Sequence, residues 1–358
     1  MKKILLLAAI AATVIACKKS DTPIMPGAND KASARMMDEF FKKYAPKEEA
    51  FVLDAAAGGT ITLSSGTTIT FPAGVFRTKG GAPVTGNVNI SARDILKASD
   101  MILANRPTLT SSGEMLESFG EIIVRARQNG EDLVLDAVKP PSVVVPIGLA
   151  NANGEQPQRM EVPMWEGDTV ITYTVSGHNH ENQLVTGTTQ VSVNRGIVWD
   201  QIPGVGFASA TSTIFPLDRL GTWLNCDALY VDPRPKTTVL GYFGDKFNWE
   251  TGNNYTSNDP TLLFFKTKNT NTLIKLYNVI LYPAPGKEGL LSYQNSIPVG
   301  QEGTFLAMSA KDGKFYAEMR DVTIPTPESG KNYVAYTFNL TEVSESQLLN
   351  LIDQMSTK

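Results

Sequence analysis

The chain has 358 residues, of which 42% are hydrophobic and 19% are charged, and its formal net charge at pH 7 is −4. This length and apolar content suffice for about two domains with substantial cores, and they exclude the helical and disordered extremes of composition. A slightly negative charge without a long basic block makes nucleic acid an unexpected partner. The chain has two cysteines, Cys17 and Cys226, so a framework of disulfides is not expected.

A short apolar segment lies close to the first residue. Lys2 and Lys3 precede an apolar run over residues 4–15, which is too short to span a bilayer comfortably and ends just before Cys17. A basic start, a short apolar run and a small residue before the cleavage point are typical of a secretory signal peptide. The sequence therefore predicts that residues 1–16 are a signal peptide.

The end of this segment carries a more specific signal. Val14, Ile15, Ala16 and Cys17 resemble the lipobox of bacterial lipoprotein precursors. The resemblance implies that Cys17 receives a diacylglycerol, becomes the mature N-terminus and takes an acyl chain on its amine. Several acyl chains hold a protein on a membrane far better than one. We therefore expect the membrane as a partner through lipid on Cys17, and the alternative is an ordinary signal peptide followed by an incidental cysteine.

A tether and a helix are expected next. Residues 17–30 are polar, contain Pro23 and Pro26, and are expected to form a flexible tether behind the lipid. The following residues predict a short helix that Pro46 ends. We expect this helix to pack on the first β domain, although a membrane-surface or partner-binding helix would share its pattern. Its apolar face consists of Met36, Met37, Phe40, Phe41 and Tyr44.

The hydrophobic period changes to two from Phe51 onward, which predicts half-buried strands. The clearest hairpin has one apolar face over residues 122–126, the turn pair Asn129 and Gly130, and a return strand. Asn followed by Gly supplies the positive φ angles that a two-residue hairpin turn requires. Together with the helix, these strands predict a first β-sandwich domain over residues 31–148.

A second β-rich domain is expected over residues 160–358. Residues 149–159 are rich in Asn, Gln, Gly and Pro, and they are expected to mark the domain boundary. A second hairpin turns at Asp312 and Gly313. The chain ends in a helix with a capping box, Ser344 and Gln347, which is expected to close an edge or end of the second domain. The sequence thus predicts an all-β protein of two β-sandwich-like domains, with a short N-terminal helix and a C-terminal capping helix.

One series of residues resembles a known domain family. The series consists of Gly58, Gly59, Thr60, Ile61, Ser65, Gly66, Thr67, Ile69, Phe71, Pro72, Ala73, Gly74 and Phe76. Through it, residues 51–148 resemble the β-sandwich domain shared by ankyrins, netrin receptors and cartilage intermediate-layer proteins. Such domains bind other proteins or join neighbouring domains, so the resemblance implies a non-catalytic role.

A second series is similar to one in uncharacterised envelope lipoproteins of Bacteroidota. It consists of Leu220, Gly221, Trp223, Asn225, Cys226 and Asp227. Those lipoproteins reach the cell surface when acidic residues closely follow the lipidated cysteine. The resemblance implies an outer-membrane lipoprotein, and because Asp21 alone among the next four residues is acidic, the choice between the surface and the periplasmic face stays open.

Residues that could carry catalysis are few. His178 and His180 lie two residues apart beside Glu181, and a pair so spaced can chelate a metal. A durable zinc site needs three or four protein ligands, so these histidines are weak candidates and a solvated hairpin tip is the alternative. The apolar neighbours of Cys226 favour a buried thiol. Because no nucleophile elbow, zincin helix or phosphate-binding loop occurs, neither a catalytic residue nor a cofactor is expected.

The segment 241–260 interleaves aromatic rings with amide and carboxylate side chains. Rings cover the C–H face of a sugar, while polar groups bond its hydroxyls. The segment therefore predicts a glycan-binding surface, and calcium bound by the carboxylates or an ordinary core and loop are the alternatives. The candidate ligand-binding residues are Tyr242, Phe247, Trp249, Asn253, Asn254, Tyr255 and Asp259.

These observations lead to one functional expectation and one alternative. We expect an outer-membrane-anchored lipoprotein that acts as a non-catalytic binding or structural module of the cell envelope, with a protein or glycan ligand. The alternative is a lipid-anchored polysaccharide hydrolase, because two carboxyls brought together by folding leave no motif in a sequence.

Overall fold

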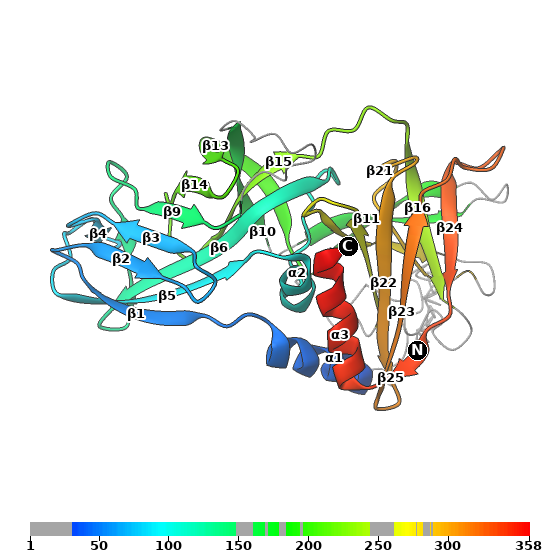
Figure 1. The fold of residues 1–358 in the computed structure, drawn as a ribbon, viewed down its shortest axis with the longest axis horizontal. Coiled ribbons are helices and arrows are strands. Elements are labelled where there is room, and N and C mark those ends of the chain that lie inside the picture. Colours follow the sequence, from blue (N-terminus) through cyan, green and yellow to red (C-terminus); the bar gives the residue numbers. More distant parts are fainter. Residues whose placement is uncertain are drawn as a thin grey trace, which may run out of the picture.

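Strands make up most of this protein, and they are arranged in two halves with helices between them (Figure 1). No helix of the described part is long and apolar enough to cross a membrane. The computed structural model describes residues 31–147, 160–168, 171–178, 184–193, 196–243, 261–276, 278–281, 287 and 289–358.

The first half is built on one eleven-stranded sheet. Its strands lie in the order β1 (Glu49–Asp54), β5 (Asn87–Ile95), β6 (Leu116–Gln128), β15 (Trp223–Leu229), β10 (Met160–Asp168), β13 (Val198–Ala208), β14 (Thr213–Pro216), β9 (Ser142–Val145), β3 (Thr68–Phe71) and β2 (Gly59–Thr62), and β7 (Glu131–Asp132) pairs with β6. A separate ribbon consists of β4 (Phe76–Arg77) and β8 (Val134–Leu135).

The eleven-stranded sheet curls over itself and encloses a core. Ile69 of β3 and Val143 of β9 share one apolar cluster with Ile90 of β5 and Ile122 of β6, although these strands lie far apart in the pairing order. The alternation of buried and exposed residues along β5 places every second side chain in this cluster. One sheet thus supplies both layers of a sandwich.

The second half is a sandwich of two sheets. The seven-stranded sheet has the order β12 (Leu184–Val193), β11 (Ile171–His178), β19 (Asn278–Leu281), β20 (Gly289–Leu291), β16 (Lys236–Phe243) and β21 (Ile297–Pro298), and β24 (Tyr333–Phe338) pairs with β16 in parallel. The five-stranded sheet has the order β18 (Leu273–Lys275), β17 (Thr261–Thr267), β22 (Glu302–Lys311), β23 (Lys314–Thr323) and β25 (Thr341–Val343). Phe305 of β22 joins the two sheets, since its ring centroid lies 4.7 Å from that of Phe265 and 5.5 Å from that of Phe338.

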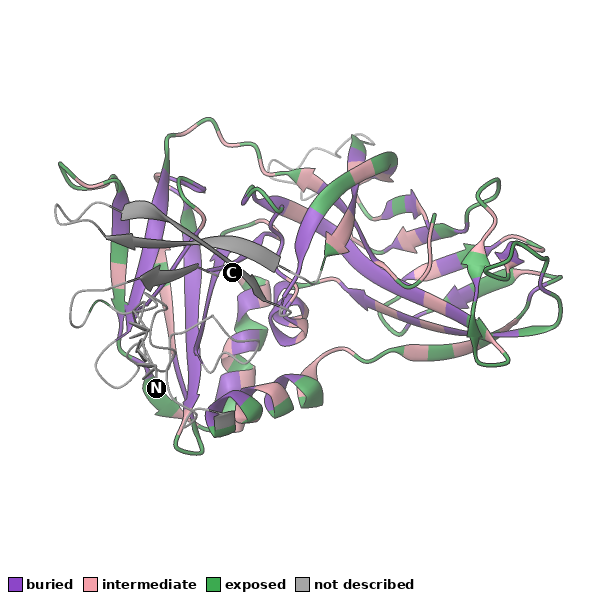
Figure 2. Ribbon diagram, turned by 180° about the vertical axis from the view of Figure 1, so that it is seen from behind, coloured by how far each residue is buried: buried purple, intermediate pink, exposed green. Residues whose placement is uncertain are grey.

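Three helices of the described residues fill the space between the halves. They are α1 (Lys31–Tyr44), α2 (Ala98–Ala104) and α3 (Glu345–Gln354), and a 3₁₀ turn over Met355–Thr357 follows α3. Their apolar sides are buried (Figure 2). They share one cluster with Trp165 and Trp199 of the eleven-stranded sheet and with Leu306 of the five-stranded sheet. The helices therefore bind the two halves through a common core.

The predicted all-β architecture, with one helix near each end, is confirmed. Both expected hairpins are present, and their turns at Asn129 and Gly130 and at Asp312 and Gly313 have positive φ angles. The capping box of α3 is also present, because the Ser344 side chain accepts from the Gln347 backbone while the Gln347 side chain accepts from the Ser344 backbone.

The first sheet extends across the expected domain boundary at 149–159. Strands β10, β13, β14 and β15 follow this boundary in sequence, yet they lie in the eleven-stranded sheet, where β15 pairs with β6 and β14 pairs with β9. A division into residues 31–148 and 160–358 therefore does not match the sheets, because β11 and β12 belong to the seven-stranded sheet while β10 before them and β13 after them belong to the eleven-stranded one. The reason is compositional, since Gly, Pro and Asn are frequent in domain linkers and equally in connections between paired strands.

Helix α1 also packs differently from the expectation. Its apolar face was predicted to lie on the first β domain, but Phe40 contacts Phe315 of β23, with 5.2 Å between ring centroids. Phe40 and Met37 belong to the cluster between the halves. An apolar stripe predicts that one face is buried, but it carries no information on which surface covers that face.

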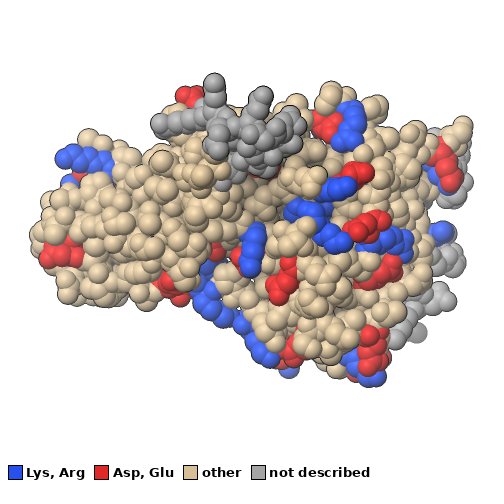
Figure 3. Space-filling model, in the orientation of Figure 1, with Lys and Arg blue, Asp and Glu red and all other residues tan. Residues whose placement is uncertain are grey.

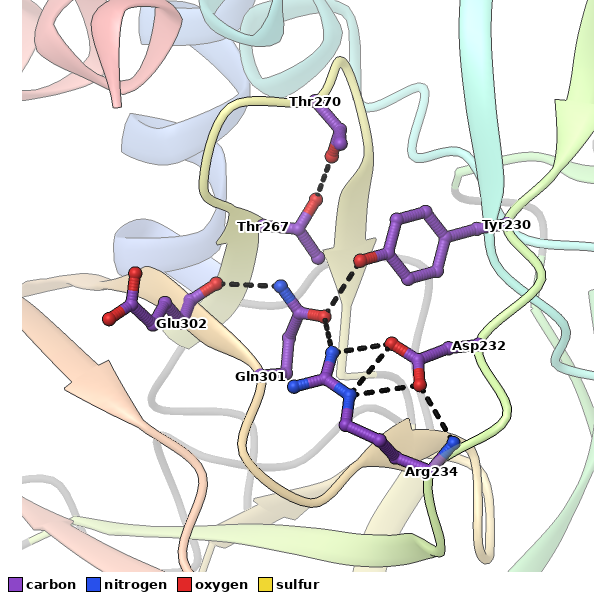
Figure 4. Close-up of polar contacts among 7 residues, drawn as sticks. All are labelled: Tyr230, Asp232, Arg234, Thr267, Thr270, Gln301 and Glu302. Carbon is purple, nitrogen blue, oxygen red and sulfur yellow. Dashed lines mark hydrogen bonds and ion pairs between the residues drawn. The ribbon is translucent and has the colours of Figure 1, made fainter. Parts of the chain in front are cut away.

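One of the segments that join the two halves, residues 230–235, is fixed by a polar network (Figure 4). Asp232 accepts two hydrogen bonds from Nε of Arg234, at 2.9 and 3.0 Å. The Gln301 side-chain oxygen accepts from Arg234 Nη2 and from the Tyr230 hydroxyl, both at 2.9 Å. These contacts hold the connection between β15 and β16 against the residues that precede β22.

Candidate functional site

Most residues predicted to bind a ligand lie outside the described part of the structure. His178 ends β11, where its backbone pairs with Leu184 of β12, and its side chain is not described. The predicted residues outside the described ranges are Cys17, His180, Phe247, Trp249, Asn253, Asn254, Tyr255 and Asp259.

Tyr242 is the one described member of the predicted aromatic surface, and it is 5% exposed. Its ring lies in a small apolar cluster with Leu240, Leu291 and Tyr333. Burial raises the pKa of its hydroxyl, and Tyr333 adds to this rise. The Nζ of Lys287 lies 4.7 Å from the ring centroid. Tyr242 is therefore a core residue whose ring is covered on the side of Lys287.

Cys226 is buried, as predicted from its neighbours. It is a thiol without a disulfide, and burial raises its pKa. In the described residues, no group of three or more His, Cys, Asp or Glu side chains could hold a metal ion.

A groove of about 560 Å³ lies beside the end of α1 and is the candidate site. Its walls come from α1, from the segment that joins α1 to β1, from β5 and from the end of α2. The lining residues are Asp38, Phe41, Lys42, Ala45, Pro46, Lys47, Glu48, Arg93, Leu103, Ala104, Asn105, Arg106 and Gly196. Four basic and two acidic residues among them give this groove a net positive lining.

Strand pairing places an arginine next to a tryptophan here. Arg93 of β5 pairs with Ile123 of β6, which pairs with Trp223 of β15. Residues opposite one another on neighbouring strands point to the same face of a sheet. The guanidinium carbon of Arg93 lies 4.9 Å from the Trp223 ring centroid, and that of Arg106 lies 5.0 Å from it. Trp223 thus holds two guanidiniums near the groove through cation–π contacts.

The Arg93 guanidinium makes few contacts within the protein. Its Nη1 donates a long hydrogen bond of 3.4 Å to the Pro46 carbonyl, and its Nε has no hydrogen-bond partner. Arg93 has no ion pair in the described residues, and burial lowers its pKa. A guanidinium has five N–H donors, of which the described contacts of Arg93 use one, and the Nε–H is buried.

Arg106 is held at the end of α2. Its Nη1 donates to the Gly196 carbonyl at 2.9 Å and to the Asn105 carbonyl at 3.2 Å. Asn105 ends α2 in the left-handed conformation, with φ of 55°. The side chain of Asn105 lines the groove, and its Oδ1 is buried without a hydrogen-bond partner. The site therefore contains donors from the arginines and one unused acceptor.

An acid pair is buried behind the arginines. Glu121 lies two residues before Ile123 on β6, so it shares the face of Arg93. It is 0% exposed, and neither carboxyl oxygen has a hydrogen-bond partner in the described part. Burial and the nearby Asp227 raise its pKa well above the ordinary value, against the opposing effect of Arg106 and Arg93. The direction of this shift favours the protonated form of Glu121 relative to an ordinary glutamate.

Asp227, by contrast, has a structural role. Its carboxylate accepts from the Phe119 backbone N–H at 3.1 Å and from the Asn225 amide. The pairing of β6 with β15 shifts register at this point, so Asp227 stabilises a bulge. Burial raises its pKa, although these hydrogen bonds oppose the rise.

The arrangement suits binding better than acid–base chemistry. Glu121 and Asp227 are both 0% exposed, and neither lines the groove. Glycoside hydrolysis requires two carboxyls on either side of a bound glycosidic bond. The groove instead presents cationic donors, which bind anionic groups. On the face in Figure 3, basic and acidic side chains are interspersed, and few lie over the first half.

Sequence reasoning found little of this groove. Trp223 and Asp227 belong to the series shared with envelope lipoproteins, but nothing singled out Arg93, Arg106 or Glu121. One signal was present in the sequence. Glu121 and Ile123 fall on the strand face opposite to the apolar face predicted for residues 122–126, so an acidic side chain shares a face with an apolar one.

No protein-family model matches the sequence of this chain, and no curated protein matches it.

Proposed function

We propose that this chain is an outer-membrane-anchored lipoprotein whose folded part is a non-catalytic module that binds a glycan or protein ligand in the cell envelope. The series that ends in Cys17 supports the anchor. One observation carries the binding function: the Arg93 guanidinium lines a groove of about 560 Å³ and has no ion pair in the described residues. Small-molecule sites are concave and contain a few well-placed polar groups of this kind.

Binding is preferred to the alternative of a polysaccharide hydrolase. The described acid pair is buried, and Glu121 lacks a contact with solvent through which it could exchange a proton with a substrate. A panel of envelope and plant polysaccharides incubated with the full chain tests this preference. We expect retention of a ligand without release of reducing ends, and product formation from any member would favour the hydrolase.

The anchor is tested by Cys17→Ser in the producing bacterium. We expect the variant to leave the outer-membrane fraction, because serine cannot carry the thioether-linked lipid. Cys226→Ala is the matched control, since it removes the other, buried thiol and should stay in the membrane fraction. Tight membrane association of the Cys17→Ser protein would contradict the proposal.

The predicted aromatic surface is a second place where a glycan could bind. Trp249→Ala and Tyr255→Ala should reduce ligand retention without unfolding the protein, while Tyr242→Phe should leave retention unchanged because this ring is buried. Equal retention by all three variants would remove the aromatic segment from the proposal and leave the groove as its site.

A further inference from the structure

We propose that the groove beside α1 binds the carboxylate of an acidic sugar, a hexuronate, through Arg93 and Arg106. This inference rests on the proposed binding function and names the chemical class of its ligand. It is carried by three features of the described residues: a guanidinium without an ion pair, a buried acceptor without a donor, and apolar walls between them.

The arginines match a carboxylate. A guanidinium is planar, and its parallel N–H donors fit the two oxygens of a carboxylate. Arg93 uses one long hydrogen bond of 3.4 Å within the protein, and Trp223 holds its guanidinium carbon at 4.9 Å. Lys42 and Lys47 line the same groove and add positive charge. A negative ligand is therefore attracted and then oriented.

The buried acid behind the arginines does not use the donors of Arg93. Glu121 is fully buried, and neither of its oxygens accepts a hydrogen bond from either arginine. A carboxylate bonded to Arg93 from within the protein would compete with a ligand for the same N–H groups. Because no such bond is present, an external carboxylate can take that place.

Asn105 favours a sugar acid over a simple anion as the ligand of the groove. Asn105 is a lining residue of the groove and is 8% exposed, and its buried Oδ1 has no hydrogen-bond donor in the described part. Leaving a buried acceptor unpaired costs about 1–3 kcal/mol, so a ligand that supplies a hydroxyl donor gains from pairing it. Inorganic phosphate offers the arginines an anion and P–O–H donors, but it has no carbon ring to lie against the apolar walls. A hexuronate offers a carboxylate and hydroxyls on one ring.

The groove walls also favour a sugar over an acidic peptide. Peptides are commonly bound as an added strand, which requires an open strand edge along the site. Here the walls come from helix ends, a connecting segment and β5, which lies between β1 and β6 and so offers no open edge, and Phe41, Pro46 and Leu103 add apolar surface. Such surface covers the C–H groups of a sugar ring, while the polar atoms are concentrated at the arginines and Asn105.

Calorimetric titration of the full lipoprotein in detergent micelles tests the inference. The probes are digalacturonate, its neutral counterpart galactobiose, inorganic phosphate, and a short peptide of aspartates. We expect saturable binding of digalacturonate and at least tenfold weaker binding of each other probe, about the effect of losing a hydrogen bond to a charged group. Absence of saturable digalacturonate binding to the unmodified chain would overturn the inference.

Two substitutions locate the binding. Arg93→Gln removes the charge and keeps a polar but shorter side chain, and it should weaken digalacturonate binding about tenfold or more. Arg127→Gln is the matched control, since Arg127 is exposed, pairs with Asp132 and lies outside this groove. Equal affinities of the two variants would contradict the assignment of Arg93.

Asn105→Gly tests the hydroxyl contact. Glycine keeps the positive φ of this position, so the end of α2 is preserved while the acceptor is lost. We expect weaker binding of digalacturonate with an unchanged preference over galactobiose. A selective loss of the preference would instead make Asn105 a carboxylate contact and contradict its assigned role.

Failure of this inference and failure of the proposed function give different results. If phosphate or the aspartate peptide binds in place of digalacturonate, and Arg93→Gln removes that binding, the groove is still a ligand site and the hexuronate class is wrong. If no probe and no polysaccharide binds, and Cys17→Ser stays on the membrane, the proposed function itself fails.

Discussion

The ammonium of Lys43 at the end of α1 lies 2.7 Å from a carboxylate oxygen of Glu345 at the start of α3, across 302 positions of sequence. The Tyr44 hydroxyl donates to the same oxygen, also at 2.7 Å. The first and last described helices are therefore joined directly, and both belong to the core between the two halves.

The apolar face of α1 should hold this helix far more strongly than its ion pair does. Phe40 is 2% exposed and packs on Phe315, so Phe40→Ala should lower the free energy of unfolding by about 3–5 kcal/mol. Lys43→Ala should change it much less, because the side chains of Lys43 and Glu345 are 60% and 42% exposed. Urea unfolding of both variants measures the difference, and similar losses would contradict it.

Glu121 should make stability fall as the pH rises. Burial raises its pKa in the folded state above the ordinary 4.5, so the folded chain keeps a proton that the unfolded chain has lost. The stabilisation is complete below the unfolded pKa and is lost as the pH rises toward the folded pKa. In Glu121→Gln this loss is absent, so its stability relative to the unmodified chain should increase from pH 5 to pH 8.

Urea unfolding across this pH range measures that trend, and Glu328→Gln gives a control whose difference from the unmodified chain should stay constant from pH 5 to pH 8. Lys331 lowers the pKa of the exposed Glu328 through a side-chain hydrogen bond. Its contribution is present above the unfolded pKa and is lost on acidification. A pH-independent difference between Glu121→Gln and the unmodified chain would show that Glu121 is ionised in the folded state.

Gly206 and Cys226 should be energetically coupled. A Cβ at position 206 would lie 2.3 Å from the Cys226 Sγ and 3.0 Å from the Phe215 Cβ. Gly206→Ala should therefore destabilise the protein by about 1–3 kcal/mol through overpacking. Adding Cys226→Ala removes the Sγ and makes room for the new methyl group, so the double variant should lose less than the sum of the single losses. Strictly additive unfolding free energies would contradict this contact.

Local signals made parts of the fold predictable. A two-residue hairpin turn needs positive φ angles, which few residue pairs other than Asn-Gly and Asp-Gly adopt. The turns at Asn129 with Gly130 and at Asp312 with Gly313 could therefore be located from the sequence. Helix α2 gave no comparable signal. It has seven residues, and Lys97 at its N-cap makes no side-chain capping hydrogen bond. Its start is therefore not marked in the sequence.

Long-range pairing limited the prediction of the sheets and of the groove. Strand β10 follows a stretch that has the composition of a linker, yet its Trp165 pairs with Asn225 in the first sheet. Likewise, Arg93 and Trp223 are brought together only because both pair with Ile123. Neither contact leaves a pattern within a short window of sequence, because strand order is decided by the packing of the whole sheet.

The position of α1 limits how far the groove can be from a membrane. Phe41 and Lys42 of this helix line the groove, and 14 residues lie from Cys17 to Asp30, just before the helix begins. A fully extended chain spans at most ~3.6 Å per residue, so lipid on Cys17 would keep the start of α1 within about 50 Å of the bilayer. Such a tether would confine the folded part, and the groove with it, to the layer next to the bilayer.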